Sequence, residues 1–328
     1  AYRYAHDDRG LVTNELAVIG GITNTIVRDF DDYGRPVRLR IADSDYDQTY
    51  AYDNKGRLSV IGIPGSIVTY AYTSDSLDAG YSVLTPSNAV LTRALTRDPL
   101  RRGLITVVSN YVTRADDGLP PSERGVARSA GGSTPCGEWS DPPSFVYTYD
   151  ALGRPITRNL DKFGYNARGE VAWARYGTNT LADVYDYDFI GNFTSNRLRG
   201  AWSQFAANEL NEYAAIADDN PRSLAYDLDG NLLTNGVWSY AYDSQNRLAS
   251  VWSNDVWVLS NAYDAHAHRT VKRTQDGTCC FLYDGWNLIQ ETFVTPTGEM
   301  NTTHYIWAKD LSGSFQGAGG VRGLLFIS

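Results

Sequence analysis

The sequence of 328 residues has few cysteines and no long hydrophobic run. Its three cysteines, Cys136, Cys279 and Cys280, are too few for a disulfide framework, so we expect free or buried thiols. No apolar stretch approaches the roughly 18 residues that a membrane helix needs, so no membrane span is predicted. Acidic residues outnumber basic ones by 38 to 29, which argues against a nucleic-acid-binding protein.

Signals for processing are also missing. The single methionine is Met300, and the chain opens at Ala1-Tyr2 without the basic and apolar regions of a signal peptide. We therefore expect a piece of a longer polypeptide, whose start says nothing about its location. Hydrophobic residues make up 42% of the sequence, which is enough for a packed core.

Aromatic residues are plentiful, with 23 tyrosines and 8 tryptophans, and many of them open a repeat. The unit reads aromatic-Asp-x-x-Gly-(Arg or Asn)-apolar. Clear copies begin at Phe30, Tyr52, Tyr149, Tyr187 and Tyr226, looser ones begin at Tyr165 and Tyr242, and Tyr263-Asp264 and Tyr283-Asp284 keep only the opening pair. Degenerate copies are expected near Tyr72 and Tyr111, and one between Tyr187 and Tyr226. A period near 20 residues predicts one β-hairpin per unit and is too short for a propeller blade.

The Asp-x-x-Gly segment of each unit has the chemistry of a turn. An Asp side chain accepts hydrogen bonds from nearby backbone N–H groups, and Gly or Asn adopts the left-handed conformation that closes a hairpin with a bulge. The predicted structural residues of the turns are Asp31, Gly34, Asp53, Gly56, Asp150, Gly153, Asp188, Gly191, Asp227, Gly230, Asp243 and Asn246.

The flanks of the turns alternate as strands do, with aromatic residues on one face. The predicted aromatic ladder consists of Tyr50, Tyr52, Tyr147, Tyr149, Tyr185, Tyr187, Trp238, Tyr240 and Tyr242. Tyrosine packs sideways against its neighbours and keeps its hydroxyl in water, so cross-strand stacking is expected. The arginines at the end of the turn are expected to lie over these rings or to pair with the turn Asp.

Four segments are predicted along the chain. Residues 1–115 hold degenerate repeats, 116–144 form an insertion rich in Pro and Gly, 145–310 hold well-formed repeats, and 311–328 form a Gly-rich lead-in to a further region. Short helical turns are expected at 181–184 and 208–217. The glycines from Gly313 to Gly323 indicate a flexible stretch or the start of a segment that continues beyond it.

No catalytic, cofactor-binding or metal-binding residue is predicted. His266 and His268 alternate as two zinc ligands on a strand would, but no third ligand stands nearby except Asp264 and Asp276, so we interpret this segment as a decayed repeat turn. The aspartates occupy the same turn position in every clear copy of the unit. We therefore interpret them as structural turn residues and not as the catalytic carboxylate pair of a glycosidase. The aromatic ladder admits two interpretations, because ring faces that pack in a sheet also stack on sugars.

These units resemble the tyrosine-aspartate (YD) repeats of the Rhs family, whose relatives include the C components of insecticidal toxin complexes and the teneurins. The resemblance covers nearly the whole chain and is strongest from Tyr149 to Leu325. Three specific stretches are Phe163 to Val171, Phe281 to Ile289, and Tyr305 to Ser314 followed by Gln316-Gly317-Ala318-Gly319-Gly320. The last resembles the lead-in to the family's Rhs-associated core.

The resemblance implies an all-β fold in which hairpins join into one long, curved, spiralling antiparallel sheet, part of a hollow shell. In polymorphic toxins of this family the shell encloses a C-terminal toxin or effector domain, and an Asp-Pro-containing motif cleaves itself. Asp98-Pro99 and Asp141-Pro142 lie too far upstream for that role. We therefore expect a non-catalytic wall segment of a secreted or cell-surface protein, with an enclosed effector as its partner. The alternative is a cell-surface adhesion or carbohydrate-binding module with surface glycans as partners.

Overall fold

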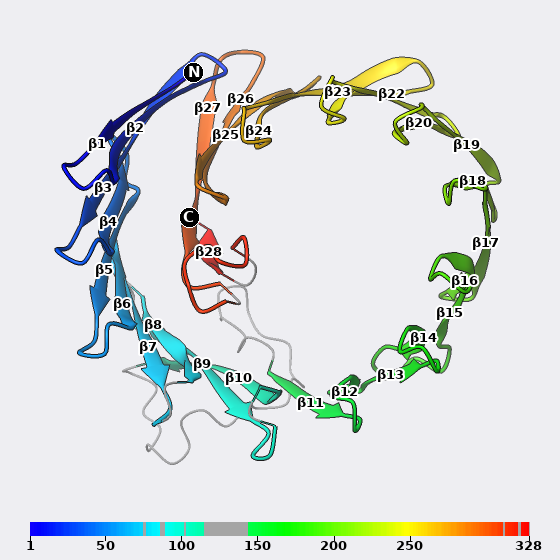
Figure 1. Cartoon of the computed structure of the whole chain (residues 1–328), viewed down its shortest axis with the longest axis horizontal. Helices are drawn as coiled ribbons and strands as arrows, with labels where there is room; N and C mark the ends of the chain where they lie inside the picture. The colour runs from blue at the N-terminus through cyan, green and yellow to red at the C-terminus, as the bar shows by residue number, and fades with distance from the viewer. Residues whose placement is uncertain are drawn as a thin grey trace. The chain divides into compact units, whose positions relative to one another are not determined.

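The computed structural model describes residues 1–74, 77–85, 89–101, 103–114, 144–310, 312–320 and 323–327. Over these residues the chain is all-β, with 28 strands in one antiparallel sheet and no helix (Figure 1). The expected all-β, antiparallel class is therefore confirmed. Within the same residues, no helix has the length and hydrophobicity for a membrane span.

The strands are short and follow one another with turns between them. The first twelve are β1 (Tyr2–His6), β2 (Val12–Ile19), β3 (Ile22–Phe30), β4 (Pro36–Ile41), β5 (Asp47–Tyr52), β6 (Leu58–Ile63), β7 (Ser66–Tyr72), β8 (Asp78–Leu84), β9 (Ala89–Arg97), β10 (Ile105–Arg114), β11 (Phe145–Tyr149) and β12 (Pro155–Arg158). The next eight are β13 (Asp161–Tyr165), β14 (Val171–Arg175), β15 (Asp183–Tyr187), β16 (Phe193–Leu198), β17 (Ala201–Ala207), β18 (Tyr213–Ala217), β19 (Arg222–Tyr226) and β20 (Leu232–Asn235). The last eight are β21 (Trp238–Tyr242), β22 (Leu248–Ser253), β23 (Val256–Tyr263), β24 (Arg269–Thr274), β25 (Gly277–Asp284), β26 (Asn287–Val294), β27 (Met300–Trp307) and β28 (Leu324–Ile327).

The helical turns expected at 181–184 and 208–217 are wrong. The first stretch leads into β15, and the second consists of a turn at 208–212 followed by β18. Alanine favours a helix in isolation, but its preference is small. Here the ladder to β17 pairs Ala215 and Ile216 with Ala206 and Phe205, and this pairing decides the local structure.

Contacts divide the chain into two compact units. Unit 1 comprises Ala1–Tyr2, Leu16–Asn24 and Asp161–Ser328, and unit 2 comprises Arg3–Glu15 and Thr25–Leu160. The segment boundaries expected from the sequence stay predictions. The expected insertion at 116–144 and Cys136 lie outside the described residues, except for Ser144, whose Oγ accepts the backbone N–H of Asn110 at 2.9 Å.

Unit 2 contains a run of paired strands from β3 to β12, each antiparallel to the next. Alternate residues of these strands point to one buried face, as period-two patterning requires. Ile26, Leu58, Ile61 and Val68 are fully buried there. The Oε1 of buried Gln48 is satisfied within this core, because it accepts the hydroxyls of Tyr46 at 3.0 Å and Tyr50 at 2.9 Å.

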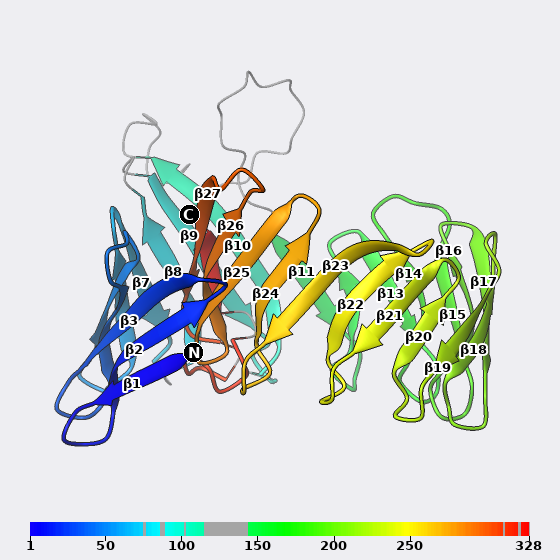
Figure 2. The ribbon, with the colours of Figure 1, turned by 90° about the horizontal axis from the view of Figure 1, so that it is seen from above.

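Unit 1 contains the run from β13 to β28, in which every strand pairs antiparallel with the next. Figure 2 shows the hairpins between β19 and β24 side by side, with turns at both of their ends. Because consecutive strands run in opposite directions, the turns alternate between two edges of the ribbon. Turns that begin with Asp or Asn at 166, 188, 208, 227, 243 and 264 therefore share one edge.

A segment from the start of the chain packs on the last part of unit 1. Ala17 and Ile19 are buried, and Gly20 lies so close to Cys280 that a Cβ there would stand 2.5 Å from its Sγ. The Nε2 of Gln290 donates to Oδ1 of Asn24 at 3.2 Å. These contacts cover a face of β25 and β26 that would otherwise expose the buried core around Ile289.

The two cysteines of β25 are free thiols. They are consecutive residues of a strand, so their side chains point to opposite faces and cannot bridge. Burial raises the pKa of both the Cys279 and the Cys280 thiol, which keeps them protonated at neutral pH.

Candidate functional site

The recurring turn is the most repeated side-chain arrangement in the chain. In the copy at Asp53, the backbone N–H of Asp53 donates to Arg57 at 2.8 Å, and that of Gly56 donates back to Asp53 at 2.9 Å. Oδ1 of Asp53 accepts the N–H groups of Lys55 and Arg57, and Oδ2 accepts Nε of Arg57 at 2.7 Å. Gly56 has a φ of 76°, in the left-handed region. We call this arrangement an Asp turn.

Both backbone hydrogen bonds of the Asp turn occur in twelve places among the described residues. They begin at Asp7, Asp31, Asp53, Asp150, Asn166, Asp188, Asn208, Asp227, Asp243, Asp264, Thr295 and Asp310. Asn246 takes the place of glycine with a φ of 59°, and Ala267 does so in the His266–His268 copy with a φ of 66°. The structure therefore places both histidines in a repeat turn.

Sequence reasoning missed some of these turns. Asp7-Asp8-Arg9-Gly10 has the Asp-x-x-Gly core, but His6 stands in the aromatic position and Leu11 stands where other copies have Arg or Asn. The copy at Asn208 uses Asn for both Asp and Gly, and it is the degenerate unit expected between Tyr187 and Tyr226. Tyr72 ends β7 at a bulge, as its expected unit requires, but Tyr111 lies inside β10 opposite Thr92.

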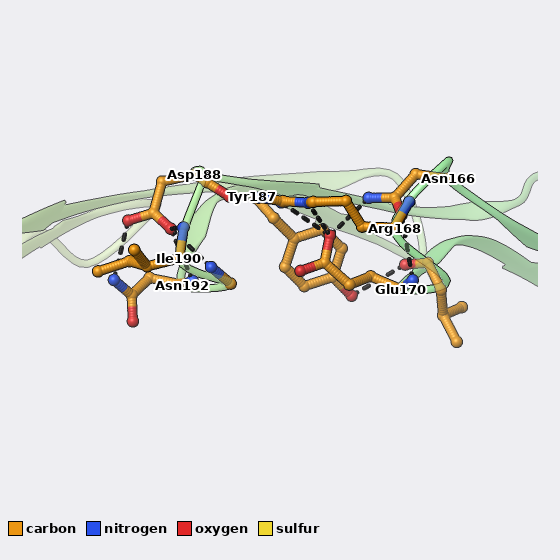
Figure 3. Close-up of polar contacts among 9 residues, drawn as sticks. Asn166, Arg168, Glu170, Tyr187, Asp188, Ile190 and Asn192 are labelled. Carbon is orange, nitrogen blue, oxygen red and sulfur yellow. Dashed lines mark hydrogen bonds and ion pairs between the residues drawn. The ribbon is translucent and has the colours of Figure 1, made fainter.

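Several Asp turns also contact the next one along the edge. Figure 3 shows Arg168, in the turn that begins at Asn166, reaching the carbonyl oxygen of Asp188 in the following turn. The same link joins Arg247 to the carbonyl of Asp264 at 2.9 Å. A guanidinium also covers the next ring, because Arg247 lies 4.7 Å from the centroid of Tyr263. Within unit 2, Arg57 lies 4.1 Å from the ring centroid of Tyr72 in the same way.

The tyrosine of each unit closes a gap left by a β-bulge. At Tyr52 the register shifts, so Ser59 is an extra residue and the strand after the turn bends. The Tyr72 hydroxyl of the next unit donates to the carbonyl of Leu58 beside this bulge at 2.6 Å. The same bond joins the pairs Tyr52–Pro36, Tyr149–Ile105, Tyr187–Val171, Tyr226–Tyr213, Tyr263–Leu248 and Tyr283–Arg269.

The repeat tyrosines therefore differ from the expectation that their hydroxyls stay in water. They bond backbone carbonyls of the preceding unit instead. Burial raises the pKa of Tyr52 and of Tyr72 to about 12, so both hydroxyls keep the proton that they donate. A tyrosine is required here because phenylalanine would supply the ring without the donor.

Tyr72→Phe tests this bond. We expect it to lower the free energy of unfolding by about 1 kcal/mol, because the Leu58 carbonyl loses a neutral hydrogen bond. Tyr33→Phe is the matched control, since Tyr33 is 86% exposed at a turn tip and should be silent. Urea unfolding of both variants measures the difference. Equal losses would show that the hydroxyl contact contributes nothing specific.

The predicted ladder residues lie in several environments. Tyr147 and Tyr149 stack within β11, with centroids 6.3 Å apart at 21°. Tyr185 and Tyr187 both contact Phe193, at 5.9 Å and 5.0 Å, and Phe193 contacts Phe205 in turn. Trp238 is exposed, whereas Tyr240 and Tyr242 are half-buried. The stacking in this region thus runs through phenylalanines that the predicted ladder did not include.

The turn carboxylates make stability depend on pH. Burial works against ionisation of Asp31, but the Arg35 side chain and the N–H groups of Arg35 and Tyr33 prevail and hold its pKa below 3.8. A carboxylate whose pKa is lower in the folded state stabilises the fold above its unfolded pKa. That contribution is lost as the pH falls through the folded value.

We therefore expect the chain to keep this contribution in full above the ordinary pKa of an aspartate and to lose it as the pH falls through the lower folded pKa of Asp31. The Asp31→Asn variant should show a shallower acid dependence, since its side chain cannot ionise. Asp32→Asn, one residue along, lies outside the turn's hydrogen bonds and should keep the wild-type dependence. Urea midpoints across the acid range measure both. Identical curves for the two variants would refute the assignment.

The copy at Asp264 is more enclosed than the others. Its carboxylate accepts the N–H groups of His266 and His268, the Nδ1 of His268 at 3.0 Å and the Tyr2 hydroxyl at 3.1 Å. The His268 ring stacks on Tyr283 with centroids 4.7 Å apart at 14°. His268 thus occupies the last position of this Asp turn, where other Asp turns have arginine. No group of three metal-ligating side chains occurs among the described residues.

The Gly-rich stretch after β27 is organised around one carboxylate. Asp310 is buried and accepts the N–H groups of Ser312, Ala318 and Gly320. Gln316 fastens the tip of the β25–β26 hairpin, because its Nε2 donates to the carbonyl of Asp284 and its Oε1 accepts the N–H of Trp286. Residues 312–320 are therefore held by hydrogen bonds, unlike the flexible stretch that the glycines suggested.

Comparisons with known proteins agree with this repeat. Residues 157–288 match the family described as teneurin YD-shell. The pore structure of the Photorhabdus luminescens Tc holotoxin is similar over 94% of this chain and 18% of that chain, at 14% identity and a TM-score of 0.45. A crystal structure of TcdB2-TccC3-Cdc42 matches 94% of this chain and 20% of that chain, at 13% identity and a TM-score of 0.39. This chain spans about a fifth of the length of either. No curated protein matches it.

Proposed function

Because residues 157–288 match the teneurin YD-shell family, we propose that this chain belongs to the YD-repeat family and forms a wall segment of an Rhs-type shell. In this proposal the wall encloses a C-terminal toxin or effector domain of the parent chain, takes no part in catalysis, and belongs to a secreted or cell-surface protein. The partner of this segment is then the enclosed domain.

The observation that carries the proposal is how the repeat uses its own polar groups. At Asp53, Arg57 and Tyr72, for example, the Asp carboxylate closes a turn, the arginine covers the tyrosine ring of the next unit, and the hydroxyl of that tyrosine bonds the preceding unit. Groups that an enzyme would turn toward a substrate are here committed to joining neighbouring hairpins. Such a continuous sheet suits a wall.

Limited proteolysis of the full parent chain tests enclosure. A domain inside a wall should resist protease under native conditions and become cleavable when low urea loosens the sheet. The matched control is the same C-terminal domain expressed alone, which should be cleaved without urea. Equal native cleavage of the free and attached domain would overturn the proposal.

The exposed indole of Trp238 favours a second candidate, a carbohydrate-binding surface. The ring faces of Tyr72 and Tyr263 do not support it, because guanidinium groups already cover them. A glycan-array signal that Trp238→Ala abolishes, and that Tyr263→Ala leaves in place, would support this candidate. A blank array would dismiss it.

A further inference from the structure

The Asp-turn edge of unit 1 carries large apolar side chains at its tips. In the turns at 188–192, 208–212 and 227–231, which we call the acidic edge, Phe189 is 87% exposed, Ile190 60%, Leu210 78% and Leu228 106%. Single exposed apolar residues are ordinary on protein surfaces, but a row of them on consecutive turns marks a binding surface. The Asp-turn chemistry does not require these residues, since the turn at Asp243 has Ser244 and Gln245 instead.

The acidic edge is strongly negative. Its fifteen positions carry Asp188, Glu209, Glu212, Asp227 and Asp229, and no lysine or arginine. Asp188 and Asp227 bond neutral Asn192 and Asn231 at the end of their turns, so their charge is not cancelled there. An apolar partner for this edge should therefore be basic, which disfavours an anionic membrane or a second acidic edge.

Part of the opposite edge of the same unit, from the turn before β13 to the turn before β17, has the complementary character. Residues 161–162, 175–183 and 197–201, which we call the basic edge, carry four cations, Lys162, Arg175, Arg197 and Arg199, against Asp161 and Asp183. Both aspartates bond backbone N–H groups, of Gly177 and Arg199, each at 2.8 Å. The side chains of Lys162 and Arg199 are exposed, and Leu181 and Leu198 stand beside them as exposed apolar tips.

The two edges also share a spacing. Successive turns on one edge are two strands apart, roughly 10 Å, because neighbouring strands lie about 4.8 Å apart. The apolar residues at the turn tips of one copy therefore repeat at the same interval as those at the turn tips of a second copy. We propose that the acidic edge of one copy of this chain docks against the basic edge of a second copy. The contact joins two different surfaces, so it is head-to-tail and extends beyond a dimer.

Sedimentation velocity tests this association with two variants. The acidic-edge variant combines Phe189→Ser, Ile190→Ser, Leu210→Ser and Leu228→Ser, and the basic-edge variant combines Leu181→Ser, Leu198→Ser and Arg199→Glu. The wild type should form dimers and larger species as its concentration rises through the micromolar range. Each variant alone should associate at least about tenfold more weakly, because it lacks one of the two surfaces.

The mixture of the two variants is the decisive sample. Each variant keeps the edge that the other lacks, so an equimolar mixture should form dimers and nothing larger. A basic-edge variant that self-associates like the wild type would overturn the head-to-tail contact, and a monomeric wild type would overturn the association itself. All changed side chains are exposed, and melting curves check that folding is kept. If a multiple variant melts early, Glu209→Lys mixed with Arg199→Glu repeats the test by charge alone.

Discussion

Gly277→Ala is expected to lower the free energy of unfolding by about 3 kcal/mol, because a methyl group there meets backbone atoms of the neighbouring strand. Gly277 starts β25 with a φ of 149°, and a Cβ there would stand 2.4 Å from the carbonyl oxygen of Val294 on the paired strand. Backbone atoms cannot rotate away as a side chain can, so β25 and β26 must separate. Chemical denaturation measures the loss.

Gly298→Ala is the matched control for this variant. Gly298 lies in the turn after β26 with a φ of 88°, and a Cβ there would meet no atom within 4 Å. This variant should therefore lower the free energy of unfolding by only about 1 kcal/mol, because alanine is unfavourable in the left-handed conformation. Similar losses for both variants would show that the close approach to Val294 is not the cause.

Asp264→Ala should also lower the free energy of unfolding by about 3 kcal/mol, because it leaves buried partners of a carboxylate unsatisfied. The side chains of Asp264 and His268 are 6% and 10% exposed, and the Tyr2 hydroxyl bonds the same carboxylate. Asp229→Ala, on an exposed turn, is the control and should change stability little. Calorimetric melting of both variants measures the difference.

A double-mutant cycle with Tyr2→Phe sharpens this prediction. If the Tyr2 hydroxyl acts through Asp264, its removal should cost about 1 kcal/mol in the wild type and almost nothing in the Asp264→Ala variant. Fully additive losses would mean that the two residues stabilise the chain independently.

The repeat unit itself could be predicted because its information is local. Asp, two intervening residues and Gly specify a turn through bonds that span at most five residues, as at Asp53. The same locality explains the successful expectation of a worn-down unit near Asn208, where spacing alone showed that one was missing. It also explains the failure at 208–217, where a weak alanine preference was given more weight than that spacing.

Contacts between repeat units could not be predicted from the sequence. Nothing in the order of residues indicates that the Tyr72 hydroxyl meets the carbonyl of Leu58, since this depends on a bulge that shifts the register at Tyr52. The bond from Tyr2 to Asp264 joins residues 262 positions apart and involves one side chain from each. The hydrogen-bonded arrangement after β27 was not predicted, because its glycines suggested a flexible stretch. In the structure, buried Asp310 accepts the backbone N–H groups of Ala318 and Gly320.

The bond from a repeat tyrosine to the bulge before it has a direction, because seven such tyrosines reach backward along the chain to the preceding unit. Disruption of one of these hairpins therefore frees a carbonyl in the hairpin before it and a tyrosine hydroxyl in the hairpin after it. Each hairpin depends on both of its neighbours, so a local defect weakens the sheet on either side of it.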